Sequence, residues 1–460
     1  PDYKFEQDAR ASLSKTSHMT RKVTYINIVK SKVITCIDIT VSGEMTRTAG
    51  LKRKAVEDTE RKAKRARGET DLSENLRWSH VGDLIKGVCP LITLTSTTLE
   101  GRSKVAGFDI DFTVIKTASG RKFATGVSDW EWWNECVPTK LQKLHKDGYR
   151  VVFFTNQAGI EKMKVKPEEV KVKIENIIQE LNIPVLAFIC TGNNHYRKPS
   201  TLMWEYFEEQ CNNGVKVNHQ NSLYVGDAAG RSKDWEPGKP KDFSCSDRMF
   251  AFNLKIKFYT PEEFFLEEPP ANFKWGCVDP TTYLKKAPTP SVTSYHNKTQ
   301  EVIILVGPPA SGKSTFRKRH LEPHDYVAIN RDTMGTMSKC IKAAKDALSK
   351  GSSVVADNTN PSADARSAFV KLGEEMGVAC RCFLMTTPIE LAKHLNLVRQ
   401  NQTNGEVRRI PDVAYNVYKK NFQEPSKSDG FSEIVKIDFC PKFDSQKDEV
   451  LFKQRTCAGH

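Results

Sequence analysis

The sequence predicts an α/β protein built from two parallel-sheet, three-layer domains that follow a basic N-terminal segment. First, short apolar runs alternate with helix-type segments, which is typical of parallel sheets whose strands are joined by helices. Second, these runs end in polar or small residues, and open α/β sheets bind ligands at the carboxyl ends of their strands. Third, one run leads into a glycine-rich loop that ends in Gly-Lys-Ser, which indicates a phosphate-binding turn.

Composition limits the function classes before any motif is considered. The 460 residues, of which 38% are hydrophobic and 27% charged, allow two or three folded domains and a solvated stretch. Lys and Arg outnumber Asp and Glu by 70 to 56, and the net charge of +14 favours a polyanionic partner such as nucleic acid. No run approaches the roughly 18 to 20 apolar residues of a membrane span, and the first residues, PDYKFE, lack the apolar core expected of a signal peptide. We therefore expect no membrane partner.

The first 95 residues form a segment whose fold the sequence does not predict. Two runs rich in β-branched residues, 22–29 and 33–41, indicate strands, but no chemical motif follows them. Eight basic and three acidic residues lie between 52 and 67, in two basic clusters separated by an acidic gap. This pattern resembles a bipartite nuclear localisation signal, and the alternative is a solvated helical linker. The enzymatic interpretation below favours the signal, and with it a nuclear location.

The first α/β domain is predicted at 96–270, with paired aspartates after its first strand. Its strands are expected at 104–110, 151–154, 185–189 and 222–225. Asp109 and Asp111 follow the first of them in the run DIDFT, and side chains two apart on an extended segment face the same way. Both carboxylates can therefore reach one phosphate, where one attacks phosphorus and the other protonates the leaving alkoxide. Alone, the motif is short enough to occur by chance.

Three further residues at strand ends or helix starts complete a set with the paired aspartates. Thr155 has a hydroxyl that can bind a phosphate oxygen, Lys198 can neutralise the phosphate, and Asp227 can bind magnesium. Magnesium is expected because a dianionic phosphate must approach an anionic aspartate. Separately, these residues could be a strand-end cap, a solvated charge and a turn residue. Those alternatives do not explain why all of them fall at the strand ends of one sheet.

A Pro-rich stretch separates this domain from a second one. The residues 271–298 are predicted to be a linker or packed connector, 299–445 a second α/β domain, and 446–460 a C-terminal tail. Strands of the second domain are expected at 301–306, 326–329, 353–356 and 380–385.

The second domain opens with the phosphate-binding loop GPPASGKST, residues 307–315. Gly307 and Gly312 let backbone N–H groups wrap a phosphate, Lys313 neutralises the β and γ oxygens of ATP, and the hydroxyls of Ser314 and Thr315 face the nucleotide and magnesium. A tight turn that binds no nucleotide is the alternative. The strand before the loop and the helix-type segment after it argue against that alternative.

Two acidic residues and an arginine are predicted to complete the nucleotide site. Asp357 follows an apolar strand, as a Walker B carboxylate that organises magnesium does, and Asp332 is then the better base for an attacking hydroxyl. Arg399 lies in a region with the character of a mobile lid and can stabilise transferring phosphoryl charge. Each acid could instead be a helix N-cap, and the arginine a surface residue.

The first set of motifs resembles haloacid-dehalogenase-type phosphatases and the second resembles P-loop kinases. Their order is similar to that in bifunctional polynucleotide kinase 3′-phosphatases, and the motifs are FTNQAGI (154–160), YRKP (196–199), VGDAAGR (225–231), KDFSCSDR (241–248), NRDT (330–333) and DNTNP (357–361). The resemblance covers residues 100 to 440. It implies a monomeric enzyme that uses Mg²⁺ and ATP to remove 3′-phosphates and phosphorylate 5′-hydroxyls at DNA breaks, with repair scaffold and ligase proteins as partners.

The resemblance also implies a role for each matching residue. In the phosphatase domain Asp109 is the nucleophile that forms an aspartyl-phosphate, and Asp111 is the general acid and base. The metal ligands implied for this domain are Asp109, Asp111 (through its backbone carbonyl) and Asp227, and Thr155 and Lys198 bind the phosphate. In the kinase domain, the resemblance implies that Lys313 is the cation that binds ATP and that Ser314 and Asp357 bind the metal ion. It also implies that Asp332 is the base and that Arg399 is the arginine of the lid.

One residue departs from the family's pattern and bears on whether the phosphatase domain is active. The family has glycine where this chain has Phe112, so the loop either avoids a positive φ there or carries strain. A repair scaffold with one inactive catalytic domain is therefore an alternative. A second alternative is an RNA end-healing enzyme, because the motifs recognise phosphate and hydroxyl groups but not the 2′ position of the sugar. The forkhead-associated domain of vertebrate relatives has no counterpart motif in residues 1–95.

Overall fold

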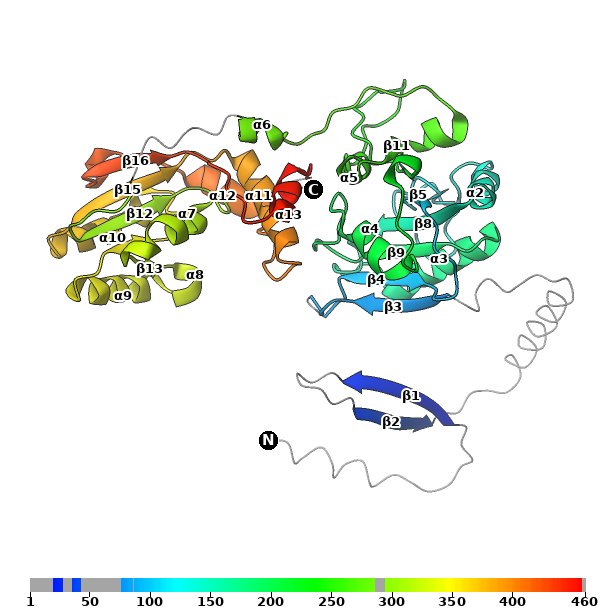
Figure 1. Ribbon diagram of the computed structural model, residues 1–460, viewed down its shortest axis with the longest axis horizontal. Helices are drawn as coiled ribbons and strands as arrows, with labels where there is room; N and C mark the ends of the chain where they lie inside the picture. Colours follow the sequence, from blue (N-terminus) through cyan, green and yellow to red (C-terminus); the bar gives the residue numbers. More distant parts are fainter. Residues whose placement is uncertain (1–19, 28–34, 43–75, 86, 286–293, 457–460) are drawn as a thin grey trace, which may run out of the picture. The chain divides into compact units, whose positions relative to one another are not determined.

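The computed structural model describes residues 20–27, 35–42, 76–85, 87–285 and 294–456 (Figure 1). The chain divides into two compact units, residues 1–71 and 72–460. In the first unit, β1 (Thr20–Asn27) pairs with β2 (Thr35–Ser42) in antiparallel register, where the β-branched runs predict strands. The basic clusters at 52–67 lie outside the described residues.

The second unit begins with a seven-stranded sheet in the order β11-β10-β5-β8-β9-β4-β3. The strands are β3 (Arg77–Val81), β4 (Leu91–Thr95), β5 (Lys104–Phe108), β8 (Tyr149–Asn156), β9 (Leu186–Cys190), β10 (Leu223–Val225) and β11 (Lys257–Tyr259). The strands from β11 to β9 are parallel, while β4 is antiparallel to β9 and β3 is antiparallel to β4. The sheet therefore starts before residue 96, the predicted start of the domain, because β3 and β4 extend its edge.

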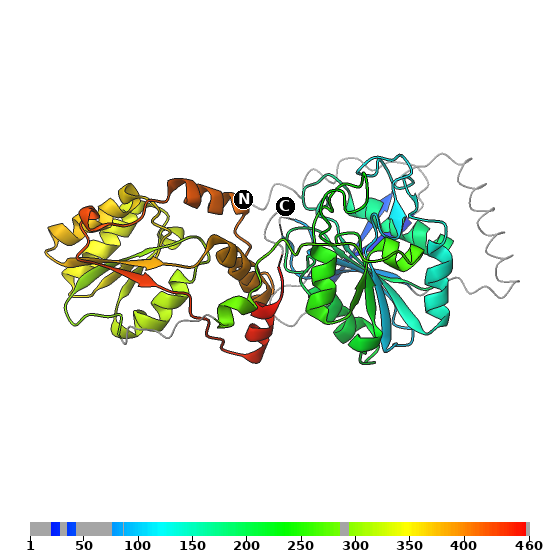
Figure 2. The ribbon, with the colours of Figure 1, turned by 90° about the horizontal axis from the view of Figure 1, so that it is seen from above.

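Helices cover both faces of this sheet, as the view from above in Figure 2 shows. The helices are α2 (Val137–Lys146), α3 (Pro167–Leu181), α4 (Leu202–Tyr206) with its continuation η1 (Phe207–Cys211), and α5 (Ser246–Leu254). The short elements are β6 (Ile115–Lys116), β7 (Glu131–Trp132), η2 (His219–Asn221) and η3 (Glu262–Leu266). On one face α2 and α3 pack into a core with Phe108 and Phe153, and on the other α4 and α5 pack around Phe154 and Trp204. The two cores define three layers.

A second sheet of five strands is parallel throughout, in the order β13-β14-β12-β15-β16. Its strands are β12 (Glu301–Val306), β13 (Val327–Ile329), β14 (Val354–Ala356), β15 (Ala379–Met385) and β16 (Glu433–Ile437). Every residue of β12 is buried, as expected for a central parallel strand that is covered on both faces.

Helices pack on both faces of the second sheet too, around cores that contain Ile304 and Phe369 on one face and Leu305 and Phe316 on the other. The helices of this part are α7 (Lys313–His320), η4 (Glu322–His324), α8 (Arg331–Met334), α9 (Met337–Ser349), α10 (Ala363–Glu375), α11 (Ile389–Gln402), α12 (Asp412–Asn421), η5 (Lys427–Asp429) and α13 (Gln446–Lys453). Before the sheet, α6 (Thr281–Lys285) lies in the predicted connector. The predicted fold class, α/β with parallel sheets, is confirmed.

Side-chain caps explain where several of these helices begin. The side chain of Thr336 accepts a hydrogen bond from the Lys339 N–H at the start of α9, and Ser362 caps Ala365 in the same way at the start of α10. These caps satisfy backbone donors that the first helical turn leaves without partners. They fix the helices that pack against the strands whose ends carry the candidate sites. No helix among the described residues is both long and apolar enough to cross a membrane.

Candidate active sites

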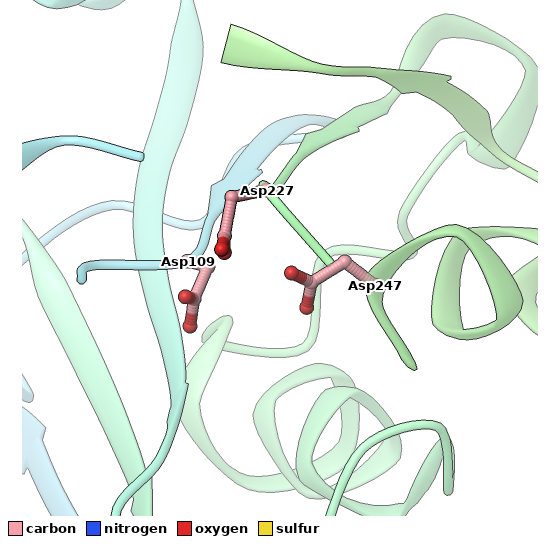
Figure 3. A group of neighbouring side chains, drawn as sticks. All are labelled: Asp109, Asp227 and Asp247. Atoms are coloured by element: carbon pink, nitrogen blue, oxygen red, sulfur yellow. The ribbon is translucent and has the colours of Figure 1, made fainter. Parts of the chain in front are cut away.

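Three buried or half-buried aspartates meet at the carboxyl end of the first sheet (Figure 3). Asp109 follows β5, Asp227 follows β10, and Asp247 lies in the first turn of α5. One carboxylate oxygen of each lies within 4.8 Å of the other two. The backbone fixes this arrangement, because the Asp109 N–H donates to the Val225 carbonyl over 2.9 Å and ties the ends of β5 and β10 together.

The buried Lys198 lies against this carboxylate cluster. Its Nζ is 2.7 Å from Asp109 Oδ1 and 2.7 Å from Asp247 Oδ1, and it donates to the Tyr224 hydroxyl over 2.7 Å. Lys198 is only 3% exposed, so both ion pairs are shielded from water. Burial opposes the charged form of Lys198, but the two carboxylates outweigh it and raise the pKa of this lysine. Lys198 therefore stays protonated.

The pKa values of two of the acids are raised as well, which for a carboxyl group disfavours the charged form. Burial raises the pKa of Asp109, opposed by Lys198 and reinforced by the charge of Asp247. Burial, together with Asp109 and Asp247, raises the pKa of Asp227 well above its usual value. Three carboxylates and one lysine carry a net charge of −2 when all are ionised. A divalent cation would balance this charge, and carboxylate oxygens are the ligands that hard cations prefer.

The second aspartate of the predicted pair, Asp111, lies outside that cluster. Its Oδ2 accepts a hydrogen bond from Gln157 Nε2 over 2.7 Å, and its Oδ1 is 3.0 Å from Lys173 Nζ. The Gln157 amide also donates to Thr155 Oγ1 over 3.0 Å, so it bridges the predicted acid and the predicted phosphate ligand. The side chain of Asp111 is 42% exposed, which leaves it accessible to a substrate.

Phe112, which stands where the family has glycine, lies in the loop between Asp109 and β6. The φ of Phe112 is +60°, in the left-handed region that suits glycine. Of the two predicted possibilities, a loop that avoids positive φ and a loop that is strained, the structure therefore has the second. The next residue, Thr113, accepts a hydrogen bond from the Asp227 N–H over 3.0 Å. The loop thereby connects the paired aspartates to the third carboxylate.

All five residues predicted for the phosphatase site line one cavity of about 640 Å³. They are Asp109, Asp111, Thr155, Lys198 and Asp227. Asp247, Gln157 and Lys173 line the same cavity, and none of them was predicted as a site residue. In contrast, the neighbouring Asp242 forms an ion pair with Arg231 at 2.9 Å and holds the loop after β10.

The phosphate-binding loop follows β12 in the second sheet. Ala310 and Gly312 have φ of +56° and +97°, and α7 begins at Lys313. A side chain at Gly307 would not fit, because a Cβ there would lie 2.8 Å from Ser311 Oγ and 2.9 Å from Met385 Cβ. Ser314 is exposed in the first turn of α7, and so is Thr315. Backbone N–H groups at this helix start can bind an anion.

Lys313 folds back over the loop that it follows. Its Nζ donates to the carbonyls of Gly307 and Pro308 over 2.9 and 2.7 Å. Burial lowers the pKa of Lys313 to about 8, and the charges of Asp357, Arg399 and Asp332 also act on it. These three residues are the other charged residues predicted for the kinase site.

These three members differ in burial and contacts. Asp357, directly after β14, is 3% exposed, and its Oδ2 accepts a hydrogen bond from Arg317 Nε over 3.0 Å. Asp332 is exposed on α8, and its N–H donates to Asn330 Oδ1 over 2.7 Å. Arg399 on α11 donates to Asn396 Oδ1 over 3.2 Å. Arg317 lies one turn after Lys313 on α7, and no motif in the sequence points to it.

Comparison with known proteins gives matches over both domains. The family model "Polynucleotide kinase 3 phosphatase" matches residues 104–265, and an "AAA domain" model matches 302–339 and 336–425. The "Bifunctional polynucleotide phosphatase/kinase" of Schizosaccharomyces pombe is 37% identical over 346 residues, which are 74% of this chain and 81% of that protein. A "Putative bifunctional polynucleotide phosphatase/kinase" of Acanthamoeba polyphaga mimivirus is 34% identical over 362 residues, 73% of this chain and 85% of that protein.

The fold, the two sites and these matches define an enzyme with a phosphatase domain followed by a P-loop kinase domain. The chain belongs to the bifunctional polynucleotide phosphatase/kinase family. The resemblance stated from the motifs is confirmed, and so is the prediction that the protein is an enzyme. Its two domains imply the use of ATP and of a divalent metal ion.

Proposed function

We propose that this protein removes 3′-phosphates from DNA ends and phosphorylates DNA 5′-hydroxyls with ATP, so that broken strands can be ligated. The names of its relatives support a polynucleotide substrate. The observation that carries the phosphatase half is the buried ion pair of Lys198 and Asp109, which lies in a cavity that also holds Asp111 and Thr155. A carboxylate beside a fixed cation in a cavity is suited to attack a phosphate.

In the phosphatase reaction, an oxygen of Asp109 attacks phosphorus and the bond to the 3′ oxygen breaks. Asp111 protonates the departing 3′ oxygen and becomes the carboxylate that Gln157 and Lys173 hydrogen-bond. That carboxylate then accepts a proton from the water that attacks the aspartyl-phosphate, which releases inorganic phosphate and restores Asp109. Throughout, Lys198 and the Thr155 hydroxyl bind the phosphoryl oxygens.

The divalent metal of the phosphatase site is proposed to be Mg²⁺. The donor set fits it, since Asp109 and Asp227 offer oxygens within 4.8 Å of each other beside Asp247, and Asp111 can add its backbone carbonyl. When bound, the ion supplies positive charge that offsets the repulsion between the phosphate and Asp109.

In the kinase reaction, the exposed Asp332 accepts the proton of a 5′-hydroxyl whose oxygen attacks the γ-phosphorus of ATP. The bond between this phosphorus and the β–γ bridging oxygen breaks, and ADP leaves. Lys313 turns from the loop carbonyls to the β and γ oxygens, and Arg399 stabilises the charge on the transferred group. A magnesium ion that accompanies ATP would be held by the Ser314 hydroxyl and, through water, by Asp357.

One substrate tests both halves of this proposal, a nicked DNA duplex with a 3′-phosphate and a 5′-hydroxyl at the nick. We expect Asp109→Ala to abolish release of phosphate while the 5′ end is still phosphorylated. Lys313→Ala should abolish phosphorylation while the 3′-phosphate is still removed. Each variant is thus the other's folding control. Release of phosphate by Asp109→Ala at the wild-type rate would refute the nucleophile assignment.

The same assay on RNA tests the choice of sugar. Activity on 3′-phosphorylated RNA together with inactivity on the DNA substrate would overturn the DNA assignment in favour of RNA end healing. A wild-type protein that turned over neither substrate in the presence of Mg²⁺ would indicate a scaffold instead.

We also propose that the protein acts in the nucleus, as a monomer, with repair scaffold and ligase proteins as partners. The two basic clusters between residues 52 and 67 support the location. Fluorescence microscopy of the full chain carrying a fluorescent tag tests it. Replacing Lys52, Arg53 and Lys54 by alanine should leave the tagged chain in the cytoplasm, and an unchanged nuclear signal would refute the assignment.

A further inference from the structure

Phe112 has an unfavourable backbone conformation, and its side chain is not packed in the core in a way that would offset the cost. Its φ of +60° disfavours any side chain with a Cβ, and the residue is 40% exposed. The neighbouring backbone fixes this conformation, because the Val114 N–H donates to the Ile110 carbonyl over 3.0 Å and Thr113 holds the Asp227 N–H. Residues held in strained conformations without a packing role occur mainly at functional sites.

The ring of Phe112 lines the phosphatase cavity together with two other exposed aromatic side chains. Phe123 is 78% exposed and Phe243 is 59% exposed, and both line the same cavity as Asp109 and Phe112. The Lys122 ammonium lies 5.8 Å from the centre of the Phe123 ring and 5.3 Å from that of Phe243. This combination of aromatic faces and a cation is suited to a nucleotide, whose base stacks on the rings and whose backbone phosphate binds the lysine.

We propose that Phe112 is a specificity-determining residue that stacks on the base of the 3′-terminal nucleotide whose phosphate is removed. The inference rests on the proposed phosphatase function and extends it to the substrate's terminal base. Phe112 and Asp111 line the same cavity, so the nucleotide whose 3′ oxygen Asp111 protonates would lie within reach of the Phe112 ring. A base within a duplex is stacked and paired. At a nick or a duplex end, the last base pair therefore has to open before its base can stack on Phe112.

Two DNA substrates separate this role from a general effect on the loop. Both are single-stranded oligonucleotides with a 3′-phosphate, and one lacks the base of its last nucleotide. The variants are Phe112→Leu, which keeps the Cβ and the backbone strain but removes the aromatic face, and Phe112→Tyr, which keeps that face. Phe273→Leu is the matched control, because Phe273 is 36% exposed and does not line the cavity.

We expect Phe112→Leu to raise KM for the complete oligonucleotide by about 5- to 150-fold, the range for loss of one stacked base, with little change in kcat. KM for the substrate without the terminal base should not change, and Phe112→Tyr and Phe273→Leu should match the wild type on both substrates. An equal loss on both substrates, or a loss in kcat alone, would overturn the inference and make Phe112 a residue that only shapes the loop. A wild-type protein that released no phosphate from either oligonucleotide would overturn the proposed function as well.

Discussion

Replacing Lys198 by methionine should destabilise the phosphatase domain strongly. The substitution removes two buried ion pairs of 2.7 Å each, to Asp109 and Asp247. At an effective dielectric constant of about 20, each such pair has a Coulomb energy of about 6 kcal/mol. The desolvation cost of the lysine disappears with it and the acids can protonate, so we expect a net loss of about 3–5 kcal/mol.

The loss should depend on pH in a defined direction. Burial already raises the pKa of Asp109, and removing Lys198 takes away the group that opposes this shift. A carboxyl whose pKa is raised in the folded state binds more protons folded than unfolded above its unfolded pKa of about 3.9. The free energy of unfolding therefore falls as the pH rises through the folded pKa. We expect a larger loss at pH 8 than at pH 5.

Tryptophan fluorescence during urea unfolding of the full chain measures this loss. All seven tryptophans lie between residues 78 and 275, so the signal reports on the phosphatase domain and not on the kinase domain. Lys173→Met is the matched control, because Lys173 also pairs with a site carboxylate, Asp111, whose side chain is 42% exposed. That variant should lose about 1 kcal/mol or less. If Lys198→Met unfolds at the same urea concentration as Lys173→Met at pH 8, the buried ion pairs of Lys198 do not stabilise the domain as described.

Three further predictions test other contacts. Gln157→Leu removes the amide that orients Asp111, so the kcat of the phosphatase should fall at least about tenfold. The midpoint of urea unfolding, followed by tryptophan fluorescence, should not change. An unchanged kcat would contradict the role of Gln157. Arg317→Met leaves the buried Asp357 without its ion pair, so kcat/KM of the kinase should fall about tenfold. The 3′-phosphatase activity should not fall. Equal losses of both activities would indicate general unfolding. Magnesium at a hundred times its Kd should stabilise the phosphatase domain by about 2.7 kcal/mol, and chelation should reverse this shift. Asp227→Asn should abolish most of this stabilisation, and a full magnesium response in that variant would place the ion elsewhere.

Most inner strands of both sheets could be predicted from the sequence, and so could the edge strand β13, but the other three edge strands could not. The run at 301–306 matches β12, and the predicted runs at 151–154 and 380–385 fall within β8 and β15. Central parallel strands are buried on both faces and therefore appear as continuous apolar runs. The missed strands are β3, β4, β11 and β16. Three of them are edge strands, whose residues are mostly exposed or half-buried, and no motif follows any of the four.

The same limit applies to the candidate sites. Asp109 and Asp227 follow strands, so the rule that ligands gather at strand ends could find them. Asp247 and Lys173 approach the cavity from the helices α5 and α3. Asp247 lies in the run KDFSCSDR that carries the family resemblance, but its spacing does not show that it meets Asp109 and Asp227, and no motif points to Lys173. Arg317 reaches Asp357 from α7 in the same way. Contacts made by helix packing depend on how each helix is placed on the sheet, which local sequence patterns do not specify.

The proposed reaction depends on Asp109 as the nucleophile of a 3′-phosphatase. The most direct test is acid quenching of a single turnover on a 3′-phosphorylated DNA oligonucleotide, followed by mass spectrometry of the peptide that contains Asp109. In the wild-type protein, part of the Asp109 should carry the phosphoryl group during the first turnover. The Asp111→Asn variant lacks the acid for the first step as well as the base for the second, so the group should form more slowly on Asp109 and persist there longer. Release of phosphate with no phosphoryl group on Asp109 at any time, or with the group on another residue, would contradict the account.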